Sequence, residues 1–191
     1  MNMTRIVAVF VLLAPVWLRA GPAEDVPRKF ENDGRRYKEA LVNAIKTSDR
    51  IVVTEHSHRD DFPESEQNRK NLPQFEYVQV ELDGPAKAKF LKNAEAMNDK
   101  TKTIFTTCAF VPHHAIKFYS GAKLKSTMEV CFHCSAIGWD GAKNGVSSPL
   151  PPEGLWTPVL PLIQDAGFRT DQGREVWVAR LEERRKAGRR K

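Results

Sequence analysis

The stretch AIKFYSGAKLKSTMEVCFHC, residues 115–134, carries the strongest fold signal in the sequence. It contains two runs rich in β-branched and aromatic residues that meet at Ser120 and Gly121, where glycine can supply the positive φ that a tight hairpin turn needs. The preceding run TIFTTCAFVP, residues 103–112, is also β-rich. Together these runs predict a long β-hairpin around Ser120 and Gly121.

The segments on either side of this hairpin show clear helical or strand patterns. Helical spacing of apolar residues predicts amphipathic helices, and an alternating or β-branched run predicts strands. Asp83 stands at the first position expected for a helix cap and Pro85 in the first turn, while Thr157 and Gly167 mark the expected cap and end of a later helix. The predicted elements are a helix in 34–49, a strand at 51–53, a strand in 75–82, a helix in 83–99 and a helix in 157–167.

This order of elements predicts an α+β fold in a single compact domain, with a mainly antiparallel sheet and two or three packed helices. The chain has 191 residues, which is enough for one domain with its own core. We expect a signal peptide at 1–23, the α+β domain at 24–180 and a basic C-terminal tail at 181–191.

The N-terminus has the layout of a secretory signal peptide. One basic residue, Arg5, precedes an apolar run of 13 residues from Ile6 to Leu18, and small residues follow. The run is shorter than the roughly 20 residues that a membrane span needs. We therefore expect an exported protein, periplasmic or secreted, that is cleaved after Ala20 or Ala23.

The net charge of +6 is concentrated at the C-terminus. Residues 180–191 contain seven basic and two acidic residues and so carry +5 of it. A basic surface that binds nucleic acid is usually interleaved with aromatic residues, and this segment has none. The pattern predicts no specific nucleic-acid partner, and at most a weak contact of the tail with an anionic surface.

Three cysteines and a histidine pair form the first candidate site. With the hairpin closed so that Tyr119 faces Ala122, Cys108 would face His133, and the thiols would gather on one side of the sheet. Cysteine and histidine in a C-x-x-C arrangement with a second pair suit tetrahedral zinc. The candidate ligands are Cys108, His113, His114, Cys131 and Cys134.

Other chemistry fits the same cysteines. An exported protein sees an oxidising compartment, so a structural disulfide is the main alternative to zinc. A redox or catalytic thiol is a further one, although C-x-x-C here ends a strand rather than beginning a helix. The sequence CFHCS lacks the histidine after the second cysteine that c-type haem attachment requires, and this argues against haem.

The block CAFVPHHAIKFYSGAKLKSTMEVCFHC, residues 108–134, resembles a hairpin of small, uncharacterised bacterial exported proteins that carry a Cys/Pro/His pattern followed by C-F-x-C. The resemblance covers about thirty residues and brings no activity with it. Carried over by position, it marks Cys108, Pro112, His114, Cys131 and Cys134. One residue more than expected separates Cys108 from Pro112.

A second candidate site follows the strand at 51–53. His56, His58 and Asp60 or Asp61 form the pattern H-x-H-x-D, which is similar to the zinc-binding motif of metallo-β-lactamase-fold hydrolases. Here Asp61 stands where that family has a further histidine. The resemblance implies metal-dependent hydrolysis, and a polar loop is the simpler interpretation.

These patterns favour an exported binding or structural module whose Cys/His cluster forms a disulfide or a zinc site. The alternatives are a metal-dependent hydrolase that uses His56, His58 and Asp60, and a thiol oxidoreductase that uses Cys131 and Cys134. No cofactor other than zinc is indicated. The sequence does not identify a ligand, a partner or an oligomeric state.

Overall fold

The computed structural model describes residues 30–104, 107–142 and 149–188. The predicted signal peptide and its cleavage sites lie outside these residues. The described chain forms five α-helices, three short 3₁₀ turns and five strands, and two of the 3₁₀ turns, Asp140–Ala142 and Glu153–Leu155, lie before α5. The other elements are those that position the candidate sites. In chain order they are α2 (Asp33–Thr47), β1 (Arg50–His56), a 3₁₀ turn (Arg59–Asp61), α3 (Glu64–Gln67), β2 (Glu76–Glu81), α4 (Gly84–Ala96), β3 (His114–Ser120), β4 (Lys123–Cys131), β5 (Ala136–Trp139), α5 (Trp156–Asp165) and α6 (Arg174–Gly188).

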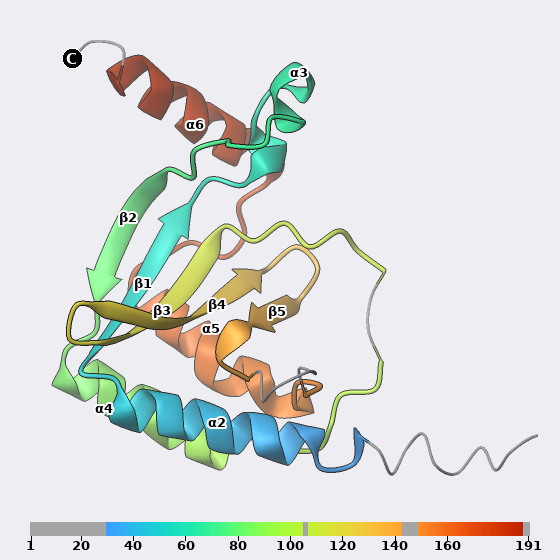
Figure 1. Ribbon diagram of the computed structural model, residues 1–191, viewed down its shortest axis with the longest axis vertical. Helices are drawn as coiled ribbons and strands as arrows, with labels where there is room; N and C mark the ends of the chain where they lie inside the picture. The colour runs from blue at the N-terminus through green and yellow to red at the C-terminus, as the bar shows by residue number, and fades with distance from the viewer. Residues whose placement is uncertain (1–29, 105–106, 143–148, 189–191) are drawn as a thin grey trace, which may run out of the picture.

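The five strands form one sheet in the order β2-β1-β3-β4-β5, and every neighbouring pair is antiparallel. Helices α2, α4 and α5 lie together near one end of the sheet, and α6 lies at the other end beside α3 (Figure 1). This confirms the predicted α+β class and the antiparallel sheet. Four longer helices pack here, one more than the sequence predicts.

The hydrophobic core lies between the sheet and the three helices α2, α4 and α5. Alternate residues of each strand point to one face, and on β1 and β3 these are Ile51, Val53, Ile116 and Phe118, each at most 1% exposed. Helix α2 contributes Tyr37, Leu41 and Ile45 at the spacing that puts them on one stripe. Burial of these side chains removes apolar surface from water and holds the two layers together.

The predicted helix cap at Asp83 is confirmed. Its side chain accepts a hydrogen bond from the backbone N–H of Ala86 at 2.8 Å, and Pro85 lies in the first turn of α4. Helix α5 begins at Trp156 after Leu155, so the predicted cap at Thr157 is wrong. Gly167 follows this helix with a φ of 83°, as the sequence predicts for its end.

The hairpin is confirmed at β3 and β4, but its predicted register is wrong. Ser120 pairs with Lys123, so Gly121 and Ala122 form the turn, with Gly121 at a φ of 57°. An irregularity between Phe118 and Tyr119 then shifts the pairing by one further residue.

The strand predicted for residues 103–112 is absent from the described part of that segment. Strand β3 begins at His114, so Cys108 lies in an irregular segment and does not pair with His133. Strand β4 instead pairs on its other side with β5, a strand that was not predicted from the sequence.

Helix α6 extends into the segment of the predicted basic tail. Residues 181–188 continue helix α6, and Leu181 is 1% exposed. Among the described residues no helix has the length and apolar composition of a membrane span.

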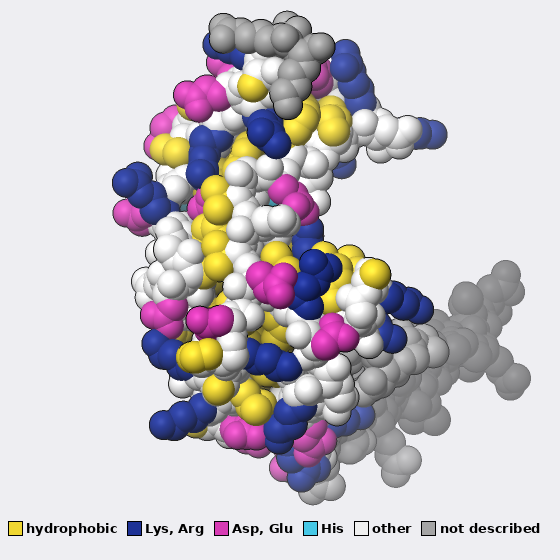
Figure 2. Space-filling view, turned by 90° about the vertical axis from the view of Figure 1, so that its left-hand side faces the viewer, with side chains coloured by type: hydrophobic (Ala, Val, Ile, Leu, Met, Phe, Trp, Pro, Cys, Tyr) yellow, Lys and Arg dark blue, Asp and Glu magenta, His cyan; other side chains and the backbone are white. Residues whose placement is uncertain are grey.

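Figure 2 looks onto the side of the molecule on which the edge strand β2 lies, and shows hydrophobic side chains in a broken stripe between charged ones. On β2, Val78 is an exposed hydrophobic residue, at 41%. Both edges of a sheet expose unpaired backbone groups, and charged side chains such as Glu76 and Glu81 limit edge pairing with other chains.

Candidate functional site

A pocket of about 610 Å³ lies at the end of the sheet that α6 covers. Four chain segments line it: the 3₁₀ turn and α3, the segment before β3, the turn after β4, and the chain that leads into α6. We call it the sheet-end pocket. Its chemically active lining residues are Asp60, Asp61, Glu64, Cys108, His113, His114, His133, Arg169, Arg174 and Trp177.

A larger and more open hollow of about 790 Å³ lies between α2 and the β3–β4 hairpin. Its described lining residues include Arg36, Glu39 and Lys125 but neither histidine nor cysteine. Its described lining therefore offers charged and hydroxyl side chains but no imidazole or thiol, and the sheet-end pocket is the better candidate site.

A buried ionic network forms the floor of the sheet-end pocket. Glu55 and His114 pair across β1 and β3, and both are 2% exposed. One carboxylate oxygen of Glu55 lies 3.5 Å from Nε2 of His114, and the other accepts a hydrogen bond from Arg180 of α6 at 2.7 Å. Burial acts to raise the pKa of Glu55, but the hydrogen bonds and charges of His114 and Arg180 outweigh it and lower this pKa below its ordinary value.

A second imidazole–carboxylate pair stands next to this network. Nε2 of His113 lies 3.0 Å from Oδ1 of Asp61, and the other carboxylate oxygen accepts the backbone N–H of His58 at 2.7 Å. The ring of Trp177 stacks on the His113 ring at 4.3 Å between centroids, with 5° between the planes. Asp61 and Trp177 together fix the position and plane of His113, as a carboxylate does for a general base.

The same tryptophan connects the two pairs. Trp177 is 3% exposed, and its ring meets that of His114 edge to face at 5.7 Å. Phe132 and Phe168 meet the His114 ring in the same edge-on way. Because these rings exclude water from His114 and Glu55, the floor of the pocket is both charged and rigid.

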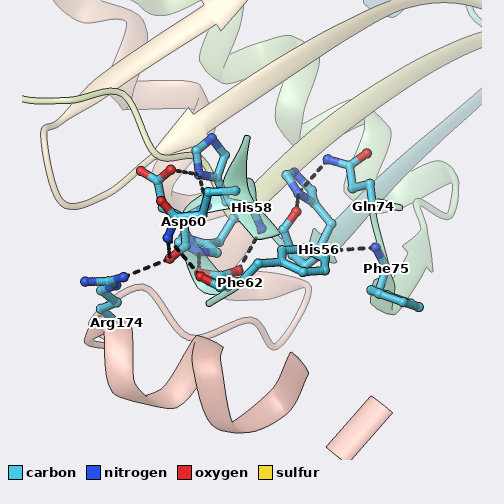
Figure 3. A network of polar contacts seen from close by, with 11 residues as sticks. His56, His58, Asp60, Phe62, Gln74, Phe75 and Arg174 are labelled. Atoms are coloured by element: carbon cyan, nitrogen blue, oxygen red, sulfur yellow. Dashed lines mark hydrogen bonds and ion pairs between the residues drawn. The ribbon is translucent and has the colours of Figure 1, made fainter. Parts of the chain in front are cut away.

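The predicted H-x-H-x-D motif is divided between two environments (Figure 3). Asp60 and Asp61 line the sheet-end pocket, whereas His56 is 1% exposed and lies outside its lining. Nδ1 of His56 lies 2.8 Å from Nε2 of Gln74 and 3.1 Å from the carbonyl oxygen of Ser57. Burial lowers the pKa of His56 to about 4, so its ring is neutral at pH 7.

The side chain of His58 caps the 3₁₀ turn through hydrogen bonds with the backbone. Its Nδ1 accepts a hydrogen bond from the N–H of Asp60 at 3.2 Å, and Asp61 accepts one from the N–H of His58, which together cap the 3₁₀ turn. Burial also lowers the pKa of His58. The Nδ1 atoms of His56 and His58 are thus hydrogen-bonded to groups close to each histidine. The described contacts do not bring His56, His58 and Asp60 around one point.

The three cysteines do come together, although not through the predicted register. Beside burial, the neighbouring thiols of Cys131 and Cys108 raise the pKa of Cys134, which places the three thiols near one another, and none of the three is in a disulfide among the described residues. Cys131 and Cys134 are buried and Cys108 is exposed. Ser135 follows at a φ of 48°, a left-handed conformation that lets the chain turn sharply after Cys134.

The thiol cluster and the sheet-end pocket share a wall. Phe132 and His133, between the two cysteines of the C-x-x-C turn, line the pocket together with Cys108. Burial and the neighbouring thiols of Cys131 and Cys108 raise the pKa of Cys134 to about 12. Cys134 is therefore a protonated thiol at neutral pH.

The predicted zinc ligands are thus only partly brought together. Cys108, His113 and His114 line the pocket, and Cys131 and Cys134 lie behind its wall. In the described ranges no group of three or more histidine, cysteine, aspartate or glutamate side chains is placed to hold one metal ion. The same ranges contain no disulfide.

Sequence reasoning missed Glu55, Trp177 and Arg180. A signal for Glu55 was present, because it follows Ile51 and Val53 in the same alternation and must therefore face the core. Trp177 and Arg180 stand in a charged segment with weak periodicity, so nothing local indicates that they reach the end of the sheet.

Comparison with protein-family models, with curated proteins and with solved structures finds no match to this chain.

Proposed function

We propose that this protein is a binding module, and that the sheet-end pocket takes a small amphoteric molecule, one that carries both an anionic and a cationic group. Free amino acids and short peptides are the simplest members of this class. A pocket of about 610 Å³ is large enough for them.

The observation that supports this proposal is the charge of two pocket walls. Asp60 and Glu64 contribute carboxylates from one chain segment, and Arg169 and Arg174 contribute guanidinium groups from another. Within the described residues neither Arg169 nor Glu64 has an ion-pair partner, and Arg174 donates only to the backbone oxygen of Asp60 at 3.0 Å. These charges are therefore available to a ligand of the opposite sign.

The charges behind the walls are already paired. Asp61 is held by His113, and Glu55 by His114 and Arg180. A ligand would meet a floor that does not need to rearrange, which lowers the entropic cost of binding. An arginine fork suits a carboxylate, and the carboxylates of Asp60 and Glu64 on the adjoining segment suit an ammonium group.

The test is a binding titration measured by calorimetry. The ligands are a panel of amino acids and dipeptides, and matched compounds that lack either the amino or the carboxyl group. We expect the amphoteric compounds to bind at least ~10-fold more tightly than either single-charge analogue. Arg174→Gln and Glu64→Gln should each remove this preference. The matched controls are Arg184→Gln and Glu183→Gln, because both side chains are exposed on α6 away from the pocket.

Equal affinity for the single-charge compounds would contradict the proposal, as would pocket variants that bind like the controls. The described contacts give less support to a metal-dependent hydrolase, because among the described residues His56, His58 and Asp60 are not placed around one point where they could hold a metal ion.

A further inference from the structure

His113 presents one ring nitrogen to the sheet-end pocket. Its Nε2 lies 3.0 Å from Oδ1 of Asp61, and its side chain, which is 12% exposed, lines the pocket. Among the described residues Nδ1 of His113 has no hydrogen-bond partner, and this atom is not buried. Nδ1 is therefore the ring nitrogen that a molecule in the pocket can reach.

Asp61 decides which ring nitrogen of His113 carries the proton. Its side chain is 1% exposed, and its second carboxylate oxygen accepts the backbone N–H of His58 at 2.7 Å. A carboxylate has no hydrogen to donate, so in the neutral form of His113 it is Nε2 that carries the proton and donates it to Asp61. The lone pair is then on Nδ1, and the charge of Asp61 stabilises the imidazolium that forms when Nδ1 takes a proton.

Trp177 keeps the ring of His113 in one plane. The two rings stack at 4.3 Å between centroids with 5° between their planes, and Trp177 is itself 3% exposed. A base that is already held in position loses less entropy when it reacts. His133 also lines the pocket, but its side chain is exposed and pairs with no carboxylate among the described residues. His113 is therefore the imidazole that is prepared for acid–base chemistry.

The same pocket contains positive charge. Arg169 and Arg174 line it, and among the described residues neither guanidinium is in an ion pair. A guanidinium stabilises the oxyanion that forms when water adds to a carbonyl group. Asp60 and Glu64, in the same lining, suit an ammonium group on the same molecule.

We propose that the sheet-end pocket hydrolyses small carboxylic esters that carry an ammonium group, amino acid esters above all, with His113 as the general base and Asp61 as the residue that positions it. The substrate class rests on the proposed function, because hydrolysis of an amino acid ester releases an amphoteric amino acid. The hydrolysis itself goes beyond binding.

The reaction consumes one water molecule and needs no other co-reactant. Nδ1 of His113 takes a proton from the water while the water oxygen bonds to the carbonyl carbon, and the electron pair of the C=O bond moves onto the carbonyl oxygen. When this tetrahedral intermediate collapses, the bond to the alcohol oxygen breaks and Nδ1 gives its proton to the leaving alcohol. The products are the alcohol and the amino acid, whose new carboxyl group loses its proton to the solvent.

The experiment measures the ethanol that the full chain releases from glycine ethyl ester, after subtraction of the spontaneous rate. The reference is free imidazole at the total concentration of the five histidines of the chain. We expect wild type to exceed this reference at least ~100-fold, because a positioned general base contributes about 10²-fold or more. Ethyl acetate, which lacks the ammonium group, should show a smaller excess over the same reference.

Three variants locate the activity. His113→Ala should lose at least ~100-fold in kcat with little change in KM, and added imidazole should restore part of the loss. Asp61→Asn should lower kcat at least ~10-fold, and imidazole should not rescue it. His133→Ala is the matched comparison, because it removes an exposed imidazole from the rim of the same pocket, and it should lose at least ~10-fold less rate than His113→Ala.

The comparison with free imidazole needs no variant, so a folding defect in one of them does not obscure the answer. A wild-type rate equal to that reference would overturn the proposal, and so would a His113→Ala protein as fast as wild type. An acyl group found on Cys108 by mass spectrometry after an acid quench would also overturn it, because direct attack by water leaves no acylated side chain.

The calorimetric titration separates this inference from the function on which it rests. If wild type prefers amphoteric ligands but hydrolyses no ester above the reference rate, only the hydrolysis is wrong. If it hydrolyses glycine ethyl ester through His113 but shows no preference for amphoteric ligands, the catalytic assignment stands and the proposed ligand class is wrong.

Discussion

At one end of strands β1 and β3 the core face carries the pair Ile51 and Phe118, and at the other end the same two strands carry Glu55 and His114. Both pairs are buried to nearly the same extent. The first is covered by apolar side chains of α2, α4 and α5, whereas the second is covered by α6, which brings the guanidinium of Arg180.

This contrast separates two ways of holding a helix on a sheet. The apolar end is stabilised by burial, which is non-directional and nearly independent of pH. The polar end is stabilised only while its charges remain paired, because an unpaired buried charge is costly. A protein gains little stability from such an arrangement, and we infer that the polar end exists for the pocket it supports.

The largest effect should come from the apolar end. Phe118→Ala removes a fully buried ring that contacts Trp139 at 6.0 Å between centroids, and should lower the free energy of unfolding by about 4 kcal/mol. Urea unfolding at pH 6 and pH 8 should give the same loss. The control is Leu124→Ala on the same hairpin, which is 45% exposed and should cost less than ~1 kcal/mol. A loss for Phe118→Ala below that of the control would show that this end is not the main core.

Glu55→Gln should break the polar end at a cost of about 3 kcal/mol at pH 7, because it leaves the guanidinium of Arg180 without its counter-charge. The pKa of Glu55 is lowered in the folded protein, so its contribution is present above the unfolded pKa and is lost as the pH falls through the folded pKa. The difference between wild type and variant should therefore shrink on acidification.

The control for this change is Glu76→Gln, which removes a carboxylate paired with Lys117 at the surface and should cost less than ~1 kcal/mol. Unfolding curves at several pH values between 3 and 7 measure both variants. If Glu55→Gln costs no more than Glu76→Gln, the buried network does not hold α6 in place.

A second source of acid sensitivity at the polar end is His56, a buried imidazole that is neutral at pH 7. Its pKa falls from 6.5 in the unfolded chain to about 4 in the folded one, so the unfolded state binds a proton first as the pH decreases. Stability should therefore decline between pH 6.5 and pH 4, by no more than about 3 kcal/mol from this residue.

The measurement compares the pH dependence of unfolding in His56→Gln with that of wild type, and the variant should lose less stability on acidification. His133→Gln is the matched control, because it removes an exposed imidazole on the pocket rim instead of a buried one. An acid dependence that is the same in all three proteins would mean that His56 is protonated without cost when folded.

The two ends of the sheet also differ in how far the sequence predicts them. Helices α2 and α4 and the β3–β4 hairpin rest on periodicity within a single segment, and each was predicted. The polar end depends on contacts between residues more than a hundred positions apart, such as Glu55 with Arg180. No local pattern encodes these contacts, and the charge of the last residues favours the interpretation as a solvated tail.

The thiol cluster shows the same limit in a different form. Its three members were predicted to converge, but the predicted pairing of Cys108 with His133 was wrong, because strand β3 begins at His114 and Cys108 lies in an irregular segment before it. Side-chain type indicated which residues matter, whereas the end of the strand and the register of the hairpin, which shifts at Phe118, could not be predicted from it.

The smallest effect should again come from the apolar end. Asp83→Ala removes the side chain that accepts the N–H of Ala86, and the loss of an N-cap costs about 1 kcal/mol. Helix α4 should remain in place, because Phe90 and Ala94 stay buried against the sheet. Urea unfolding measures the loss, and Asp171→Ala, in an exposed loop, is the control. A loss near that of Glu55→Gln would mean that α4, like α6, depends on one polar contact, and the two ends would then not differ in how they hold their helices.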